Sequence, residues 1–257
     1  MNSRLFILFS IIVFSTVLSC QSSNNNGQNE GDKHLYESEA DSIIALAQIA
    51  HGVAAFDSLG FEFIFRNKKY TFDFKNSMFT RSDSADWRYI KDFYQGDNFY
   101  REINGERESL TDSDQSKYAS SVNSVIYFAT LPYKLTDESV ISYDMGQQII
   151  KSNTYNGVKV EFKEKGGGED HQDVFYYWFN SKTHLIDYFA YQYETNGGGI
   201  RFREAIKQTK VGGSVFQDYV NYEVAVGTRL HEIPALFEMD SLKELSRIEN
   251  KYIRIID

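Results

Sequence analysis

The stretch that decides the fold is Phe61-Glu-Phe-Ile-Phe-Arg-Asn-Lys-Lys-Tyr-Thr-Phe-Asp-Phe74. Its aromatic residues stand at every second position in two short runs, which is the period of a strand with one buried face. A polar turn at Asn67-Lys68 separates the runs. The pattern predicts a β-hairpin with one aromatic face, which either lines a lipid pocket or fills a core. The residues of this face are Phe61, Phe63, Phe65, Tyr70, Phe72 and Phe74.

The same two-residue period recurs along most of the chain. Short Gly- or Asn-rich turns separate the later runs, which predicts an antiparallel meander and not a parallel sheet of βαβ units. The runs lie at residues 89–94, 98–103, 158–162, 174–179, 185–194, 200–207 and 215–224.

Three segments have helical spacing instead. Residues 39–55, with Ser38 as a possible cap, and residues 114–130, ended by Pro132, predict two helices. Residues 240–249 predict a short amphipathic helix near the C-terminus. We therefore expect a mainly β (α+β) fold: a curved antiparallel sheet that forms an unclosed half-barrel, with helices packed on its concave face.

Composition limits the classes of partner. The chain of 257 residues has a net charge of −9, which becomes about −10 when residues 1–19, with one Arg and no acid, are removed. An acidic domain repels phosphate backbones, so we expect no nucleic-acid partner. With 18 Tyr, 20 Phe and only two Pro, the chain favours strands, and its length suits a single core.

The N-terminus predicts a membrane anchor. Residues 5–18 form an almost wholly apolar run, too short to cross a bilayer but typical of a signal peptide. The run ends in Val17-Leu18-Ser19-Cys20, which resembles the bacterial lipobox, and Cys20 is the only cysteine. We expect cleavage before Cys20 and acylation of that residue.

These features predict the domain organisation. Residues 1–19 are a lipoprotein signal peptide, residues 20–37 a flexible polar tether, residues 38–228 the half-barrel domain, and residues 229–257 a C-terminal helical extension. Gln21 follows the cysteine where an Asp would signal inner-membrane retention in typical bacterial lipoproteins. The resemblance favours the outer membrane and leaves its periplasmic or surface face open.

Four further segments carry a resemblance to a known family. They are Ser121-Val-Asn-Ser-Val-Ile-Tyr-Phe-Ala-Thr-Leu-Pro-Tyr-Lys-Leu135, Gly166-Gly-Gly-Glu-Asp-His-Gln-Asp-Val-Phe-Tyr-Tyr-Trp178, Gly197-Gly-Gly-Ile-Arg-Phe-Arg-Glu-Ala205 and Phe216-Gln-Asp-Tyr-Val-Asn-Tyr222. Together they resemble an uncharacterised bacterial lipoprotein family, a domain of unknown function, over roughly residues 40–224. The family is similar to the LolA/LolB/RseB group of lipoprotein carriers. This resemblance implies an unclosed β-barrel with a hydrophobic cavity.

Two carboxylates are candidates for a polar site. Glu204 shares the strand parity of the apolar Phe202 and Ile206, and Asp218 shares that of Phe216. Both are therefore expected on one apolar side, where a carboxylate is costly unless a partner meets it. They form either the polar floor of a ligand cavity, an acid/base pair, or structural bonds to Tyr, Arg or a helix N-terminus. A bulge would instead turn both to solvent.

No motif predicts a catalytic residue, a metal or a cofactor. The acidic turn at residues 169–173, with His184 and Asp187 after it, fits no zinc or EF-hand spacing. The triple-glycine runs at residues 166–168 and 197–199 precede strands, so they predict turns and not phosphate loops.

The sequence is compatible with three functions. The favoured hypothesis is a non-catalytic, membrane-anchored module that holds a lipid or acyl chain, with a movable helix near residues 114–130. The second is an envelope scaffold or assembly protein with a filled core and an envelope-protein partner. The third is an enzyme that uses Glu204 and Asp218 in a polar cleft.

Overall fold

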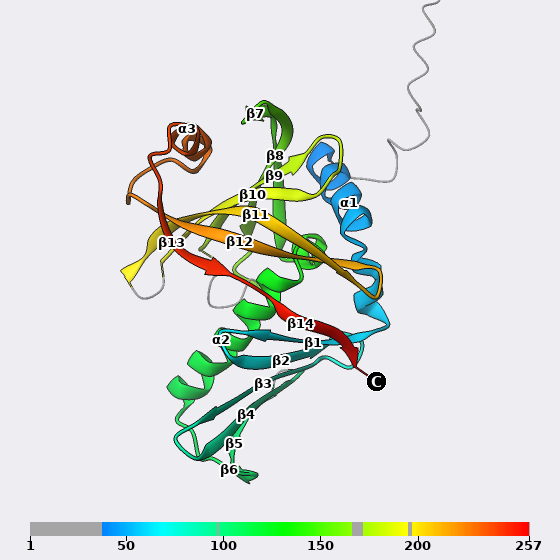
Figure 1. Ribbon diagram of the computed structural model, residues 1–257, viewed down its shortest axis with the longest axis vertical. Coiled ribbons are helices and arrows are strands. Elements are labelled where there is room, and N and C mark those ends of the chain that lie inside the picture. Colours follow the sequence, from blue (N-terminus) through cyan, green and yellow to red (C-terminus); the bar gives the residue numbers. More distant parts are fainter. Residues whose placement is uncertain (1–37, 97, 166–171, 195–196, 257) are drawn as a thin grey trace, which may run out of the picture. The chain divides into compact units, whose positions relative to one another are not determined.

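Two antiparallel sheets, not closed into a barrel, make up most of the fold (Figure 1). The computed structural model describes residues 38–96, 98–165, 172–194 and 197–256, so the predicted signal peptide, Cys20 and the tether lie outside the described residues. The mainly β, unclosed antiparallel architecture predicted from the sequence is confirmed.

The N-terminal sheet has the strand order β14-β1-β2-β3-β4-β5-β6. Its strands are β1 (Gly60–Phe65), β2 (Lys68–Asp73), β3 (Met78–Ala85), β4 (Arg88–Gln95), β5 (Asn98–Ile103), β6 (Glu106–Arg107) and β14 (Lys251–Ile256).

The C-terminal sheet has the strand order β13-β12-β11-β10-β9-β8-β7. Its strands are β7 (Val140–Ile150), β8 (Asn153–Phe162), β9 (Val174–Asn180), β10 (Ile186–Tyr193), β11 (Gly199–Val211), β12 (Ser214–Val224) and β13 (Lys243–Ile248).

The last two strands carry the chain from one sheet to the other, as Figure 1 shows in orange and red. Strand β13 pairs with β12, and β14 pairs with β1. The helix predicted at residues 240–249 is therefore wrong, and so is most of the helical extension. Only η4 (Leu230–Glu232) and α3 (Ile233–Glu238) are helical there. The open edge of β12 supplies backbone partners that override the helical spacing of the apolar residues.

The two longer helices form where the sequence predicts them. Helix α1 (Glu39–His51) starts at Ser38, whose hydroxyl accepts from Asp41 N–H at 3.2 Å, and continues into η1 (Val53–Asp57). Gly52 ends α1 at φ 64°, and a Cβ there would overlap the Gly213 carbonyl oxygen. Helix α2 (Asp112–Ala129) starts at Thr111, and η2 (Tyr133–Thr136) follows it. In the described part of the chain, none of these helices combines the length and apolarity that crossing a membrane requires.

The C-terminal sheet is covered on both faces. One face packs against α1, where Ala47 and Ile44 contact the residues around Val158 and Tyr177. The other face packs against α3 and η4, with Phe237 placed 5.1 Å, centroid to centroid, from Phe202. The sequence predicted helices on one face only.

The aromatic hairpin is confirmed, with its turn one residue earlier than expected. Arg66 and Asn67 occupy the turn at φ 48° and 63°. Phe61 pairs with Phe72 and Phe63 with Tyr70 across the two strands. These rings form a core with η1 and with the middle of α2.

Strands β3 and β7 are not predicted from the sequence, for two physical reasons. Strand β3 buries three consecutive polar residues, Thr80, Arg81 and Ser82, so the apolar alternation is missing. Strand β7 contains a register shift between Asp144 and Gln147, which breaks its two-residue period.

His51 links α1 to the C-terminal sheet. The side chain is fully buried, and its Nε2 accepts a hydrogen bond from Ile186 N–H at 3.1 Å. An accepting Nε2 requires the neutral ring. Burial lowers the pKa of His51 from 6.5 to about 4, against a smaller raising contribution from the Val215 backbone.

We predict that His51 makes stability depend on pH. Between pH 6.5 and about 4 the unfolded state binds a proton that the folded state does not. The contribution of His51 to the free energy of unfolding is therefore fully present above pH 6.5. It decreases as the pH falls, by roughly 3 kcal/mol at most. Urea unfolding of the wild type and of His51→Gln at several pH values measures the effect. The stability advantage of the wild type should shrink as the pH falls; a constant advantage would contradict the prediction.

Candidate functional site

A cavity of about 440 Å³ lies between the C-terminal half of α2 and the C-terminal sheet; we call it the main cavity. Strands β8, β9, β10 and β11 contribute to its wall, together with the segment that follows α2. Nearly half of its lining residues are aromatic: Tyr127, Phe128, Phe162, Phe175, Tyr191 and Tyr193.

Strand alternation directs these rings to one side. Phe175 on β9 is the register partner of Tyr191 on β10 and of Val160 on β8. The Phe175 and Tyr191 rings stack at 5.3 Å, and Phe128 of α2 lies 5.3 Å from the Tyr191 ring. The period that marks the first hairpin also marks Phe175 and Tyr191, so these residues were detectable from the sequence but were not singled out.

Charged and polar groups line the rest of the main cavity. Lys134 and Asp137 form an ion pair at 3.2 Å. Arg201 donates from Nη2 to the Tyr193 hydroxyl at 2.8 Å and from Nη1 to the Ile200 carbonyl at 2.9 Å. The cavity therefore joins an aromatic wall to seven polar or charged residues: Asn123, Ser124, Lys134, Asp137, Ser139, Asp173 and Arg201.

A partly buried tyrosine of α2 and a fully buried tyrosine of β9 meet beside this wall. The hydroxyl oxygens of Tyr127 and Tyr177 lie 3.0 Å apart. Burial raises the pKa of Tyr127 well above its usual value, and it raises that of Tyr177 as well. Both phenols therefore stay protonated at neutral pH, where they act as hydrogen-bonding groups and not as bases.

A second cavity of about 200 Å³ adjoins the main cavity; we call it the inner cavity. The two share Ser124, Phe128 and Tyr191 as lining residues. Arg203 and Asn221 line the inner cavity, and both side chains are more than nine-tenths buried.

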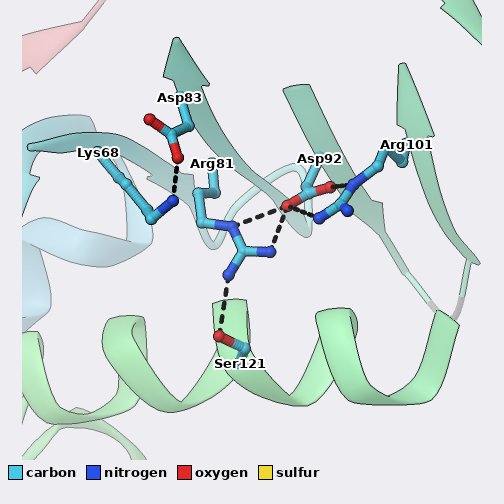
Figure 2. Close-up of polar contacts among 6 residues, drawn as sticks. All are labelled: Lys68, Arg81, Asp83, Asp92, Arg101 and Ser121. Carbon is cyan, nitrogen blue, oxygen red and sulfur yellow. Dashed lines mark hydrogen bonds and ion pairs between the residues drawn. The ribbon is translucent and has the colours of Figure 1, made fainter. Parts of the chain in front are cut away.

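An ion-pair cluster crosses the N-terminal sheet beneath α2 (Figure 2). Asp92 on β4 is the register partner of Arg81 on β3 and of Arg101 on β5. Its carboxylate accepts from Arg81 Nε at 2.7 Å and from Arg101 Nε at 2.7 Å. Arg81 Nη1 also donates to the Ser121 hydroxyl of α2 at 2.9 Å. The cluster thereby attaches α2 to the sheet.

A cavity of about 330 Å³ lies at this cluster, lined among others by Lys117 and by the Lys68–Asp83 ion pair. The Arg101 guanidinium stacks 3.6 Å above the Tyr118 ring. Arg81 and Asp92 are fully engaged with each other and their neighbours, which is the arrangement of a structural cross-link. Sequence reasoning missed the cluster because charged residues on β3 and β4 resemble solvent-facing positions.

The six predicted aromatic residues mainly fill the interior. Phe61, Phe63 and Phe72 are fully buried in the core around η1, and Tyr70 is nearly so. Phe65 lines the inner cavity. None of the six lines the main cavity.

The two predicted carboxylates have separate partners. Glu204 Oε2 accepts from the Tyr222 hydroxyl at 2.9 Å, and Asp218 Oδ1 accepts from Asn250 N–H at 2.8 Å. A register shift between Ala205 and Lys207 changes the parity of β11. As a result Ile206, expected on the apolar face, is 44% exposed. The geometry gives no acid/base pair between Glu204 and Asp218.

The predicted acidic turn is described only in part. Residues 169–171 lie outside the described residues. Asp187 accepts from Tyr155 at 3.2 Å and from Asn180 at 2.9 Å, and His184 occupies a turn at φ 58°. Among the residues that the structure describes, no three metal-ligating side chains come together.

Residues 94–250 match the model of a family of unknown function, DUF6503. The match covers more than half of the chain, and the chain belongs to this family. The expected resemblance to an uncharacterised family is thereby confirmed, over a range that starts later and ends later than expected. No curated protein matches the chain.

Several solved structures are similar to the chain at low sequence identity. A LolA superfamily protein from Nitrosomonas europaea is 10% identical, with a TM-score of 0.49 over 85% of this chain and 94% of that chain. A domain described as an outer membrane lipoprotein-sorting protein from Vibrio parahaemolyticus is 8% identical, with a TM-score of 0.42 over 84% and 93%. A DUF1329 family protein from Desulfovibrio piger is 11% identical, with a TM-score of 0.40 over 83% and 92%. Similarity at this level identifies no ligand.

We predict that Asp92 is essential for stability and that Asp83 is not. Asp92→Asn leaves two arginines without their buried counter-ion, which costs roughly 3–5 kcal/mol. Asp83→Asn, the matched control, removes a partly exposed partner of Lys68 and costs about 1 kcal/mol or less. Chemical unfolding of both variants measures the difference. Equal losses would show that the cluster does not hold α2 in the way described.

Proposed function

We propose that this chain is a lipid-anchored envelope protein whose domain binds an acyl chain or another apolar ligand in the main cavity, without catalysing a reaction. The observation that carries the proposal is the aromatic cavity between α2 and the C-terminal sheet. Its volume of about 440 Å³ lies within the range of small-molecule sites.

The chemistry of the wall supports binding more than catalysis. Phe128, Phe175 and Tyr191 offer a broad apolar surface whose burial by a ligand is favourable. Tyr127 contributes a protonated phenol, which orients a polar group but takes no proton at neutral pH. The enzyme hypothesis is weakened because Glu204 and Asp218 each have their own hydrogen-bond partner.

The N-terminal sequence supports the membrane part of the proposal. Cys20 after an apolar signal segment is the expected acylation site, and the polar residues that follow it suit a tether. Gln21 favours export to the outer membrane, on either face. The anchor would keep the cavity close to a supply of lipids.

The direct test is native mass spectrometry with lipid extraction on the protein purified from a bacterial envelope. A lipid that co-purifies in a defined stoichiometry supports the carrier function and identifies its chemical class. A protein that remains without ligand after incubation with envelope lipids contradicts the proposal and favours the scaffold alternative.

We predict that filling the main cavity weakens ligand binding. Ser124 on α2 lines both cavities, and Ser124→Trp places an indole in that space. Binding of dodecanoate, followed by calorimetry, should weaken by roughly tenfold or more, because the ligand then competes with a covalently attached ring. Gln115→Trp, at an exposed position of the same helix, is the control and should bind as the wild type does. Equal binding by all three proteins would exclude the main cavity as the site.

We predict that Cys20→Ala abolishes membrane attachment. Only a thiol at this position can receive the thioether-linked lipid, and the mature chain has no other cysteine. Labelling of the full chain with radioactive palmitate in bacteria, followed by detergent phase partition, tests this. Label that persists in the variant would place the lipid elsewhere.

A further inference from the structure

Arg203 on β11 is a buried arginine without a carboxylate partner. Its side chain is almost inaccessible, with 7% of the residue exposed. Nη2 donates to the Tyr191 hydroxyl at 3.0 Å, while Nε and Nη1 have no hydrogen-bond partner. Among the described residues, no acidic side chain forms an ion pair with Arg203. A buried charge in this situation is costly unless something else neutralises it.

The aromatic rings around Arg203 orient the guanidinium but do not neutralise it. Its central carbon lies 4.1 Å from the Phe128 ring centroid and 5.3 Å from those of Phe189 and Tyr191. These contacts hold the charge in place beside the inner cavity.

Arg81 is a buried arginine with a structural role, and its hydrogen-bond partners can be compared with those of Arg203. It is buried to a similar extent, at 9% exposed. Its Nε and Nη2 donate to Asp92, and its Nη1 donates to Ser121. Arg203 has no such set of partners, and its Nε and Nη1 donate no hydrogen bond.

The inner cavity beside Arg203 has the charge of an anion site. Arg66 and Arg203 line it, and no acidic residue does. Asn221 and Asn250 add polar groups to the wall. The cavity adjoins the aromatic main cavity, with Phe128, Ser124 and Tyr191 common to both walls.

We propose that Arg203 binds the anionic head group of the ligand, so that the ligand is an acidic single-chain amphiphile. The carboxylate or phosphate oxygens would lie in the inner cavity against the guanidinium, and the acyl chain in the main cavity. This inference rests on the proposed function and adds the chemical class of the ligand. Arginine is the side chain best suited to such oxygens, because its planar fork matches their geometry.

The test compares an acid with its neutral analogue. The chain from residue 20 onward, with Cys20→Ser to remove the acylation site, is titrated calorimetrically with dodecanoate, dodecan-1-ol and acetate. Dodecanoate should bind roughly tenfold to a hundredfold more tightly than the alcohol, since a charged hydrogen bond forms only with the acid. Acetate should bind far more weakly than dodecanoate, because it has no chain. Equal affinities for acetate and dodecanoate would contradict the inference that the ligand is an amphiphile. They would indicate a site for small anions instead.

Variants of Arg203 test the residue itself. Arg203→Met should lose the preference for dodecanoate over the alcohol, and Arg203→Lys should keep part of it. Arg229→Met, at an exposed arginine, is the matched control and should keep all of it. Thermal unfolding shows whether each variant folds. The comparison of dodecanoate with dodecan-1-ol on the wild type tests the inference even if a variant does not fold. A folded Arg203→Met that retains the preference would overturn the inference. Wild-type protein that binds neither acid nor alcohol would instead contradict the proposed function.

Discussion

The attachment of α2 to the N-terminal sheet is the constraint on which the candidate site depends. Val122, Ile126 and Ala129 bury one side of the helix in the aromatic core of that sheet. The Arg81–Ser121 hydrogen bond, backed by Asp92, holds the same helix through a polar contact (Figure 2). Side chains at successive helical positions project in different directions. Fixing one side of α2 against the N-terminal sheet therefore also fixes the directions in which its other side chains point.

Phe128 and Tyr127 are the residues of α2 that this attachment orients. They face the C-terminal sheet, where Phe128 stacks 5.8 Å from Phe189 and Tyr127 approaches the hydroxyl of Tyr177. The helix does not fill the space against β8 to β10 completely, and the main cavity is what remains. A pocket with an aromatic wall and polar groups beside it is a reason to expect a ligand.

Much of the fold could be predicted from the sequence, but less of the site. The alternation of Phe61 to Phe74 and the helical spacing around α1 and α2 are local signals, and both were sufficient. The strand β13 was missed because its pairing with β12 depends on residues distant in sequence. Arg203 was not recognised because parity alone does not reveal which buried charge lacks a partner. That property depends on every neighbour of the side chain, and only the three-dimensional structure supplies them.

The central claim is that an acyl chain occupies the main cavity, and a photoreactive fatty acid tests it most directly. A diazirine at the end of the chain is activated by light after binding, and peptide mapping locates the label. We expect labelling within the second half of α2 and on β9 and β10, near Phe128, Phe175 and Tyr191. Label confined to exposed surface residues, or to the hairpin core around Phe61 and Phe72, would contradict it.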